Sequence, residues 1–246
     1  HDYLVAPVLA ASARHENILI IGGGDGLALR DVLKYSPKAV TLIDLDSELI
    51  DIFQTPNEHL NNSLAKKISH LNKNSLQDKR VTILRSDAFI TINELLKSGQ
   101  VFDAIIVDLP DPSHPDLNKL YTVNFYARLN QLLAGDGLIA IQSTSPYHAK
   151  DSFISIGKTL KAANYPHVQQ YHDNVPSFGE WGWTIAAKMG LPPLARLNKL
   201  EKLPIQHSWL NLEILKAAFI FPNDFYKSEE NIDINILGSH TLYQLH

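Results

Sequence analysis

The sequence predicts an α/β fold, in which a doubly wound, mostly parallel sheet of seven strands carries helices on both faces. Three observations support this prediction. Apolar runs of strand length alternate with helix-like stretches along the chain. The runs are continuously apolar, as in Ile-Leu-Ile-Ile, which is typical of strands covered on both sides. With 246 residues, of which 45% are hydrophobic, the chain is long enough to bury one large core.

The predicted elements follow one another in chain order, and we expect the last two strands to form a hairpin. The candidate strands are Asn17–Ile21, Ala39–Ile43, Val81–Leu84, Asp103–Val107, Gly137–Ile141, His167–His172 and Gly182–Ala187. The candidate helices between them are Leu27–Tyr35, Ser47–Phe53, Ala88–Lys97, Val123–Leu133 and Ala149–Ala163.

Two segments interrupt this alternation. The first, Thr55–Lys79, is polar and rich in Asn, so we expect a long surface excursion. The second is the tail after Lys188, which begins with "GLPPL" and contains one amphipathic stretch, Asn211–Phe221, that ends at Pro222. We therefore predict an α/β domain over residues 1–188, which would hold any ligand-binding and catalytic site, and a C-terminal appendage over residues 189–246 that docks on it.

Composition excludes several classes of function. The net charge of −4 and the lack of a Lys/Arg run argue against a nucleic-acid partner. With no cysteine, the chain has neither disulfides nor thiolate metal sites, and its histidines lack metal-ligand spacing, so we expect no metal. The apolar runs are shorter than the roughly 18 residues of a membrane-spanning helix. Because the chain begins with His1 rather than Met, we expect it to be a piece of a longer product.

The stretch "ILIIGGGDGLALRDVL" places a glycine loop between the first strand and the first helix, where doubly wound sheets bind ligands. Gly22 and Gly24 fit the dinucleotide pattern G-x-G-x-x-G, but Leu27 stands where its third glycine belongs, and no Gly-Lys-Ser/Thr follows. The remaining pattern, Gly22, Gly24 and Gly26 around Asp25, suits a nucleoside without phosphates, because a carboxylate repels pyrophosphate. A cationic sulfonium such as S-adenosylmethionine or a derivative is the natural candidate. The alternative is a tight packing turn.

Acids follow the next two strands. Asp44 ends the second strand, where a ribose diol is usually bound. Asp46, two residues later, is better placed to cap the following helix. Asp87 follows the third strand and is able to accept a hydrogen bond from an adenine amino group, to cap a helix, or to do both.

The loop after the fourth strand, "DLPDPSHPDLNKLYT", is too polar for the core and too long for a simple connection, so we expect a lid over a site. Asp108 ends a buried apolar strand at the ligand crevice, where partial desolvation is expected. Asp111 is either part of the site or a turn cap.

Six stretches together resemble the spermidine synthase (polyamine aminopropyltransferase) family: "IGGGDGLALRDVLKY", "LIDLD", "SDAF", "IIVDLPDP", "LYTVNFYARLNQLLAGDGLIAIQSTSP" and "NVPSFGEWGWTIAAK". The resemblance covers His1 to about Lys188, and it implies a Rossmann-like fold of the class I methyltransferase type. The tail stretch "LNLEILKAAFIFPNDF" resembles a bacterial subgroup whose members often carry a membrane-embedded N-terminal region. From this resemblance we expect a cytoplasmic domain that is fused to an upstream membrane region, and a homodimer.

The resemblance also implies the chemistry and the site. The aminopropyl group of decarboxylated S-adenosylmethionine passes to a diamine such as putrescine, and methylthioadenosine is released. The residues it implicates are Asp108 as general base, Asp25 near the aminopropyl amine, Asp44 at the ribose, Asp87 and Ala88 at the adenine, Asp111 at the acceptor amine, and His1 and Gln142 at the border of the site.

One segment departs from the family pattern P-[ST]-Y-P-x-G-Q-x-G-F. Here the chain reads Pro-Ser-Phe-Gly-Glu-Trp-Gly-Trp from Pro176 to Trp183, with Phe178 in place of the tyrosine and one residue fewer. We expect Glu180 to replace the lost polar contacts, and Trp181 or Trp183 either to face a cation or to lie in the core. Two other functions stay open: a methyltransferase that uses intact S-adenosylmethionine, and a nucleoside-binding regulatory domain without a second substrate.

Overall fold

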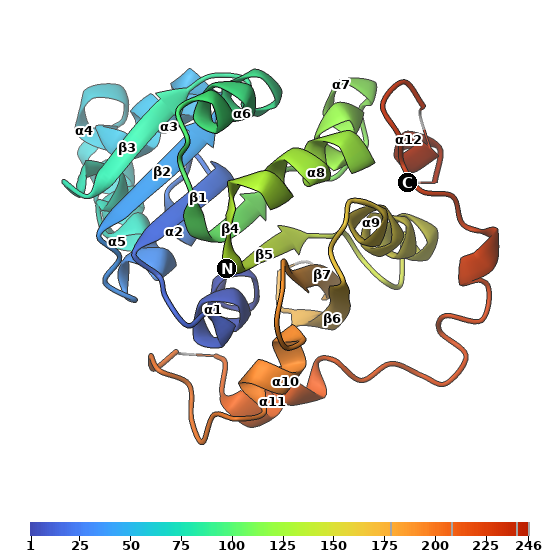
Figure 1. Cartoon of the computed structure of the whole chain (residues 1–246). Helices are drawn as coiled ribbons and strands as arrows, with labels where there is room; N and C mark the ends of the chain where they lie inside the picture. The colour runs from blue at the N-terminus through green and yellow to red at the C-terminus, as the bar shows by residue number, and fades with distance from the viewer. Residues whose placement is uncertain (178, 208, 240, 246) are drawn as a thin grey trace.

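Seven strands form one sheet in the order β3-β2-β1-β4-β5-β7-β6 in a computed structural model that describes residues 1–177, 179–207, 209–239 and 241–245 (Figure 1). All neighbours are parallel except β7, which runs antiparallel to both β5 and β6. The predicted mostly parallel sheet and its terminal hairpin are therefore confirmed. The strands are β1 (Asn17–Gly22), β2 (Ala39–Asp44), β3 (Val81–Arg85), β4 (Phe102–Asp108), β5 (Leu133–Gln142), β6 (His167–Val175) and β7 (Gly179–Ala187).

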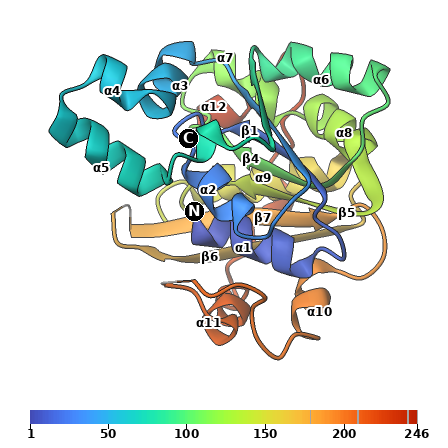
Figure 2. The same cartoon turned by 90° about the vertical axis from the view of Figure 1, so that its left-hand side faces the viewer.

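Helices cover both faces of the sheet, because successive side chains of a strand point to opposite sides. On β1, Ile18 and Ile20 pack into the core formed with α1, α2 and the tail, whereas Leu19 and Ile21 pack into the core under α6, α8 and α9. Figure 2 shows α6 and α8 on one side of the sheet and α10 and α11 on the other. The long helices are α1 (Asp2–Ala11), α2 (Leu27–Leu33), α3 (Ser47–Gln54), α5 (Asn62–Asn72), α6 (Ala88–Lys97), α8 (Val123–Leu132) and α9 (Lys150–Ala162).

Helix α1 was not predicted from the sequence. Its residues form one apolar run, "YLVAPVLAA", and all nine of these side chains are buried although Pro7 lies inside the helix. A run that is apolar all round has no 3.6-residue pattern, so periodicity does not reveal it. The helix packs on the sheet next to α2 and α10, and it carries His1 and Leu4 to the ligand cavity described below.

The segment Thr55–Lys79 is more ordered than the predicted surface excursion. It contains α4 (Pro56–His59), α5 and the 3₁₀ turn η1 (Ser75–Gln77). Most of α5 is exposed, but Asn72 at its end is fully buried and donates hydrogen bonds to the carbonyls of Phe53 (3.0 Å) and Asp25 (3.3 Å). Ser75 donates to the carbonyl of Gly26 at 2.6 Å. The segment therefore holds the glycine loop from outside.

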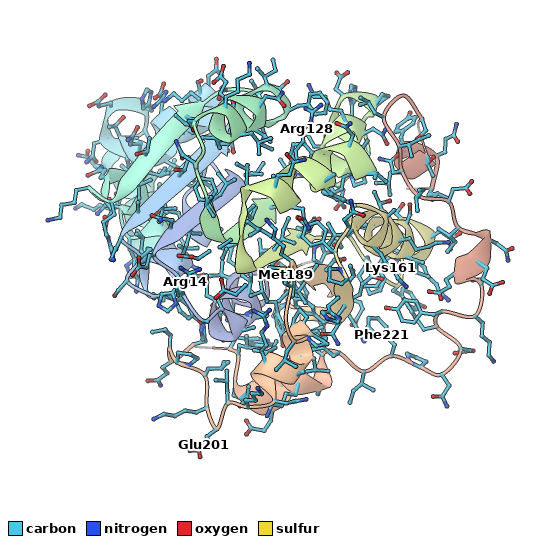
Figure 3. The ribbon with its side chains drawn as sticks, viewed as in Figure 1. Arg14, Arg128, Lys161, Met189, Glu201 and Phe221 are labelled. Atoms are coloured by element: carbon cyan, nitrogen blue, oxygen red, sulfur yellow. The ribbon has the colours of Figure 1, made fainter. Side chains whose placement is uncertain are left out.

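The tail after Lys188 wraps around the sheet on the side of α1 and continues to α9. Within the predicted amphipathic stretch the helix is shorter, because α11 ends at Ala217. Phe221, labelled in Figure 3, packs against Phe153 of α9 with ring centroids 5.9 Å apart. The remaining elements are α7 (Pro115–Asn118), η2 (Lys119–Tyr121), α10 (Pro193–Leu197), α11 (Leu212–Ala217), η3 (Glu229–Asn231) and α12 (Thr241–Leu245). The division into two units at Lys188 stays a prediction.

Among the described residues, no helix combines the length and the apolar character that crossing a membrane requires.

Candidate active site

A cavity of about 940 Å³ opens at the carboxyl ends of the central strands. The strand order reverses between β1 and β4, and parallel doubly wound sheets bind ligands at such a switch point. Of the described residues that line the cavity, Lys119 is the one lysine or arginine, whereas six carry carboxylates: Asp25, Asp44, Asp46, Asp87, Asp108 and Asp116. The cavity therefore has a strongly negative wall, which favours a cationic ligand.

The glycine loop lines the cavity, and side chains do not fit at Gly22 and Gly24. Gly22 has a φ of +83°, and a Cβ there would lie 2.1 Å from the carbonyl oxygen of Asp108 on the neighbouring strand. A Cβ on Gly24 would lie 2.8 Å from Oδ2 of Asp44. Gly26 does not line the cavity; it begins α2 and packs against Ser75 and Leu76. The structure thus gives Gly26 a role in the turn, and it does not place this residue at the cavity where a ligand contact was predicted.

Asp44 lies across the loop from β2 and is held in place by backbone amides. Its Oδ2 accepts from the amide of Gly24 at 2.8 Å, and its Oδ1 accepts from the amide of Asp46 at 2.9 Å. Asp46 caps α3 by accepting from the amide of Leu49 at 2.9 Å, as predicted. The fixed carboxylate of Asp44 faces the cavity, and its contact with a ribose stays a prediction.

Asp87 and Ala88 line the far end of the cavity, where α6 begins. Oδ1 of Asp87 accepts from the amide of Phe89 at 2.9 Å, which confirms the predicted helix cap. Oδ2 accepts from Nζ of Lys119 at 2.5 Å, an ion pair that sequence reasoning missed. Lys119 comes from the loop after β4, 32 residues away, and only the folded loop brings it to Asp87.

Asp108 and Asp25 form the centre of the acidic wall. Burial, followed by repulsion from Asp25 and Asp44, raises the pKa of Asp108 to about 6. Burial also raises the pKa of Asp25, although the amide of Leu27 donates to it at 2.9 Å. Nε2 of His1 lies 3.7 Å from Oδ2 of Asp108. A carboxylate whose pKa lies near neutral pH is suited to accept a proton from a ligand.

Asp111 lies behind the cavity wall rather than in it. Its Oδ1 accepts from Nε2 of Gln142 at 2.8 Å, and its Oδ2 accepts from Oγ1 of Thr144 at 3.4 Å. Gln142 does line the cavity. The side-chain amide of Gln142 is therefore oriented by Asp111, and contact of Asp111 with an acceptor amine stays a prediction.

The hairpin β6–β7 closes the remaining side with aromatic rings. Trp181 and Trp183 both line the cavity. Trp183 is also 95% buried, since its ring is stacked between those of Tyr3 and Tyr171 at centroid distances of 5.0 and 5.6 Å. Trp183 therefore lies in the core as well as at the cavity wall, and contact of either tryptophan with a cation stays a prediction. Phe178, which replaces the family tyrosine, lies outside the described residues.

Glu180 does not contact the cavity, contrary to the prediction. It alternates with Trp181 and Trp183 along β7, so its side chain points to the other face of the strand. There it pairs with His172 of β6 beside a separate depression that Asp173 and Trp209 also line. In this arrangement Glu180 faces away from the central cavity, which gives no support to the prediction that it supplies polar contacts to a ligand there.

The described residues contain no group of three or more histidine, aspartate or glutamate side chains arranged to hold a metal ion.

The strand order and the glycine loop at the switch point place the chain among the methyltransferase-like α/β proteins. A family model for the spermine/spermidine synthase domain matches residues 1–198, and the chain belongs to this family. Among solved structures, the chain is similar to spermidine synthase from Thermotoga maritima, with a TM-score of 0.77 and 24% sequence identity. The match covers 94% of this chain and 74% of that chain. A spermidine synthase in complex with the transition state analogue AdoDATO has the same TM-score, 25% identity, and coverage of 94% and 75%.

Two curated relatives are named for an activity. The polyamine aminopropyltransferase of Shewanella oneidensis is 52% identical over 246 residues, which are 100% of this chain and 43% of that protein. Polyamine aminopropyltransferase 1 of Streptomyces coelicolor is 39% identical over 226 residues, which are 91% of this chain and 39% of that protein. The chain thus spans less than half of the length of these relatives.

Proposed function

We propose that this chain is the catalytic domain of a polyamine aminopropyltransferase. In the proposed reaction, the aminopropyl group of decarboxylated S-adenosylmethionine is transferred to a diamine such as putrescine, and methylthioadenosine is released. The observation that carries the proposal is that two partly buried carboxylates, Asp25 and Asp108, line the cavity at the glycine loop. Both substrates are cations, and a wall of carboxylates is complementary to them.

The nucleoside half of the substrate occupies the end of the cavity between Asp44 and Asp87. Asp44 accepts hydrogen bonds from the ribose hydroxyls, since doubly wound folds use an acid at the end of the second strand in this way. Asp87 and Ala88 contact the adenine. Gly22 and Gly24 allow the ligand to approach the backbone. Asp25 then lies at the aminopropyl end, where a carboxylate pairs with the ammonium group.

The acceptor amine enters beside Asp108, between His1, Gln142 and the indole of Trp181. An alkylammonium has a pKa of about 10 and carries no lone pair, so it must lose a proton before it attacks. Asp108 accepts that proton, because its raised pKa makes it a stronger base than an ordinary aspartate. The indole of Trp181 and the oriented amide of Gln142 hold the rest of the amine.

The displacement then balances without an oxidant or a reductant. The amine nitrogen forms a bond to the carbon next to the sulfonium, while the carbon–sulfur bond breaks and its electron pair stays on sulfur. Methylthioadenosine leaves as a neutral thioether. The product nitrogen keeps one positive charge, and the proton on Asp108 passes to solvent. The cavity brings the two reacting atoms together, which converts a bimolecular reaction into a step within one complex.

Mass spectrometry of the reaction products tests the proposal. The protein is incubated with decarboxylated S-adenosylmethionine and putrescine, and the expected products are methylthioadenosine and an amine heavier by one aminopropyl group. A parallel incubation with intact S-adenosylmethionine serves as the control. S-adenosylhomocysteine in that control would indicate methyl transfer instead, and binding of the nucleoside without any product would indicate a regulatory domain. The homodimer, the cytoplasmic location and the upstream membrane region stay predictions.

A further inference from the structure

The loop between β4 and α8 is anchored by the C-terminal tail. This loop supplies Leu109, Asp116, Leu117, Lys119 and Leu120 to the cavity wall. The tail reaches it from the far end of the chain: Figure 1 shows α12 beside α7 and α9, and Leu242 of α12 is buried in the core under α8. This part of the tail lies beyond residues 1–198, which the family model matches.

Asn235 makes the central contacts between the tail and the loop. It is fully buried, and its Nδ2 donates to the carbonyls of Asn118 and Tyr121, each at 3.2 Å. Its own carbonyl accepts from the amide of Val123 at 3.0 Å, and its amide donates to Oγ1 of Thr159 in α9 at 2.9 Å. Asn235 is thus fixed to α9 on one side and holds the loop backbone on the other.

The two carbonyls that Asn235 holds lie on either side of Lys119. A second bond fixes the same turn, because Nδ2 of Asn118 donates to the carbonyl of Ser239 at 2.6 Å. From this turn Lys119 reaches into the cavity and pairs with Oδ2 of Asp87 at 2.5 Å. Direct contacts therefore connect the tail with the nucleoside end of the site: Asn235 binds the backbone on either side of Lys119, and Lys119 binds Asp87.

We propose that Asn235 is a positioning residue for the nucleoside site, because it holds the turn from which Lys119 fixes the carboxylate of Asp87. With Oδ1 bound to the amide of Phe89 and Oδ2 bound to Lys119, the orientation of this carboxylate is set before a ligand arrives. An ionised carboxylate has about four acceptor positions, so two remain for an adenine amino group. The inference rests on the proposed function, which assigns Asp87 to the adenine.

The test measures methylthioadenosine affinity by isothermal titration calorimetry in the full chain. Asn235→Asp keeps the shape of the side chain but removes both donated bonds and directs a carboxylate at two carbonyl oxygens. We expect binding about tenfold weaker, the fold-change that corresponds to one net hydrogen bond at about 1.4 kcal/mol per factor of ten. Asn235→Ala removes the same donors without adding charge and is the second variant in case the first does not fold. Asn231→Asp, the same change at an exposed position of the tail, is the control and should bind as the wild type does.

A double-mutant cycle with Lys119→Met separates positioning from a general loss of stability. If Asn235 acts through Lys119, adding Asn235→Asp to Lys119→Met weakens binding little further, although the melting temperature falls in both backgrounds. Full additivity of the two losses would overturn the proposal. So would wild-type affinity in both Asn235 variants, and the proposed function would then still stand. If the wild type itself does not bind methylthioadenosine, the proposed function and this inference both fail.

Discussion

Replacement of Asp108 by asparagine tests the proposed mechanism most directly. Asparagine keeps the size of the side chain but does not accept a proton. At pH 7, roughly one alkylamine molecule in a thousand is unprotonated, since the pKa is about 10. Asp108, with a pKa of about 6, is mostly ionised at pH 7 and able to act as a base. We therefore expect Asp108→Asn to lower kcat by about a factor of 10³ at pH 7, within the usual range for general base catalysis.

The pH profile distinguishes loss of the base from a general disturbance of the site. In the wild type, the rate should rise as the pH increases through about 6, because Asp108 loses its proton, and should then level off. In Asp108→Asn, the rate should keep rising about tenfold per pH unit towards the pKa of the amine, since only the free amine reacts.

The assay measures the rate of methylthioadenosine formation by liquid chromatography at several pH values between 5 and 10. Calorimetry measures the affinity of each variant for methylthioadenosine. Asp116→Asn is the matched control, because it removes one carboxylate from the exposed rim of the same cavity. We expect nucleoside affinity to be largely unchanged in Asp108→Asn. A rate close to that of the wild type at pH 7, or an unchanged pH profile, would refute the assignment of Asp108 as the base.

Three further predictions follow from the same contacts. Because the pKa of Asp108 is raised in the folded state, ionisation of this carboxyl lowers the free energy of unfolding as the pH rises from about 4 to about 6. Asparagine does not ionise, so Asp108→Asn should increase the free energy of unfolding by about 3 kcal/mol at pH 7 but leave it unchanged at pH 4. Thermal melts at the two pH values measure the difference. Gly24→Ala should weaken nucleoside binding, measured by calorimetry, because the new Cβ would lie 2.8 Å from Oδ2 of Asp44 and would displace this carboxylate. Asn72→Ala should lower the free energy of unfolding by about 1–3 kcal/mol in urea titrations, because it removes a fully buried amide that donates to the carbonyls of Phe53 and Asp25. A loss below about 0.5 kcal/mol would contradict the role of Asn72 in holding the glycine loop.

The central features of the site were predictable because they follow from local patterns. Each of Asp44, Asp87 and Asp108 stands at or just after the end of an apolar run, and parallel strands bring their carboxyl ends to one edge of the sheet. In the structure, Gly22 is in register with Asp108 across β1 and β4, so the loop and the base meet through strand pairing alone. The strands and the glycine loop thus determine much of the cavity.

The alternation of side chains along β7 decides which way Glu180 points. Adjacent residues of a strand point to opposite faces of the sheet. Because the segment from Pro176 to Trp183 departs from the family pattern, the sequence did not show which face of the strand Glu180 occupies. The structure directs Trp181 and Trp183 to the cavity and Glu180 to the opposite side, where it pairs with His172. A polar residue beside a site is therefore a weak predictor of contact when the register of its strand is unknown.

The sequence by itself determined the seven strands, the helices between most of them, the glycine loop and the acids at the strand ends, because these depend on patterns within a few residues. The tertiary structure alone decided the contacts between distant segments. Lys119 meets Asp87 across 32 residues, and Asn235 meets the turn around Lys119 across more than a hundred. Such pairs depend on how loops and tail pack on the finished sheet, and the order of residues along the chain carries no local signal for that packing.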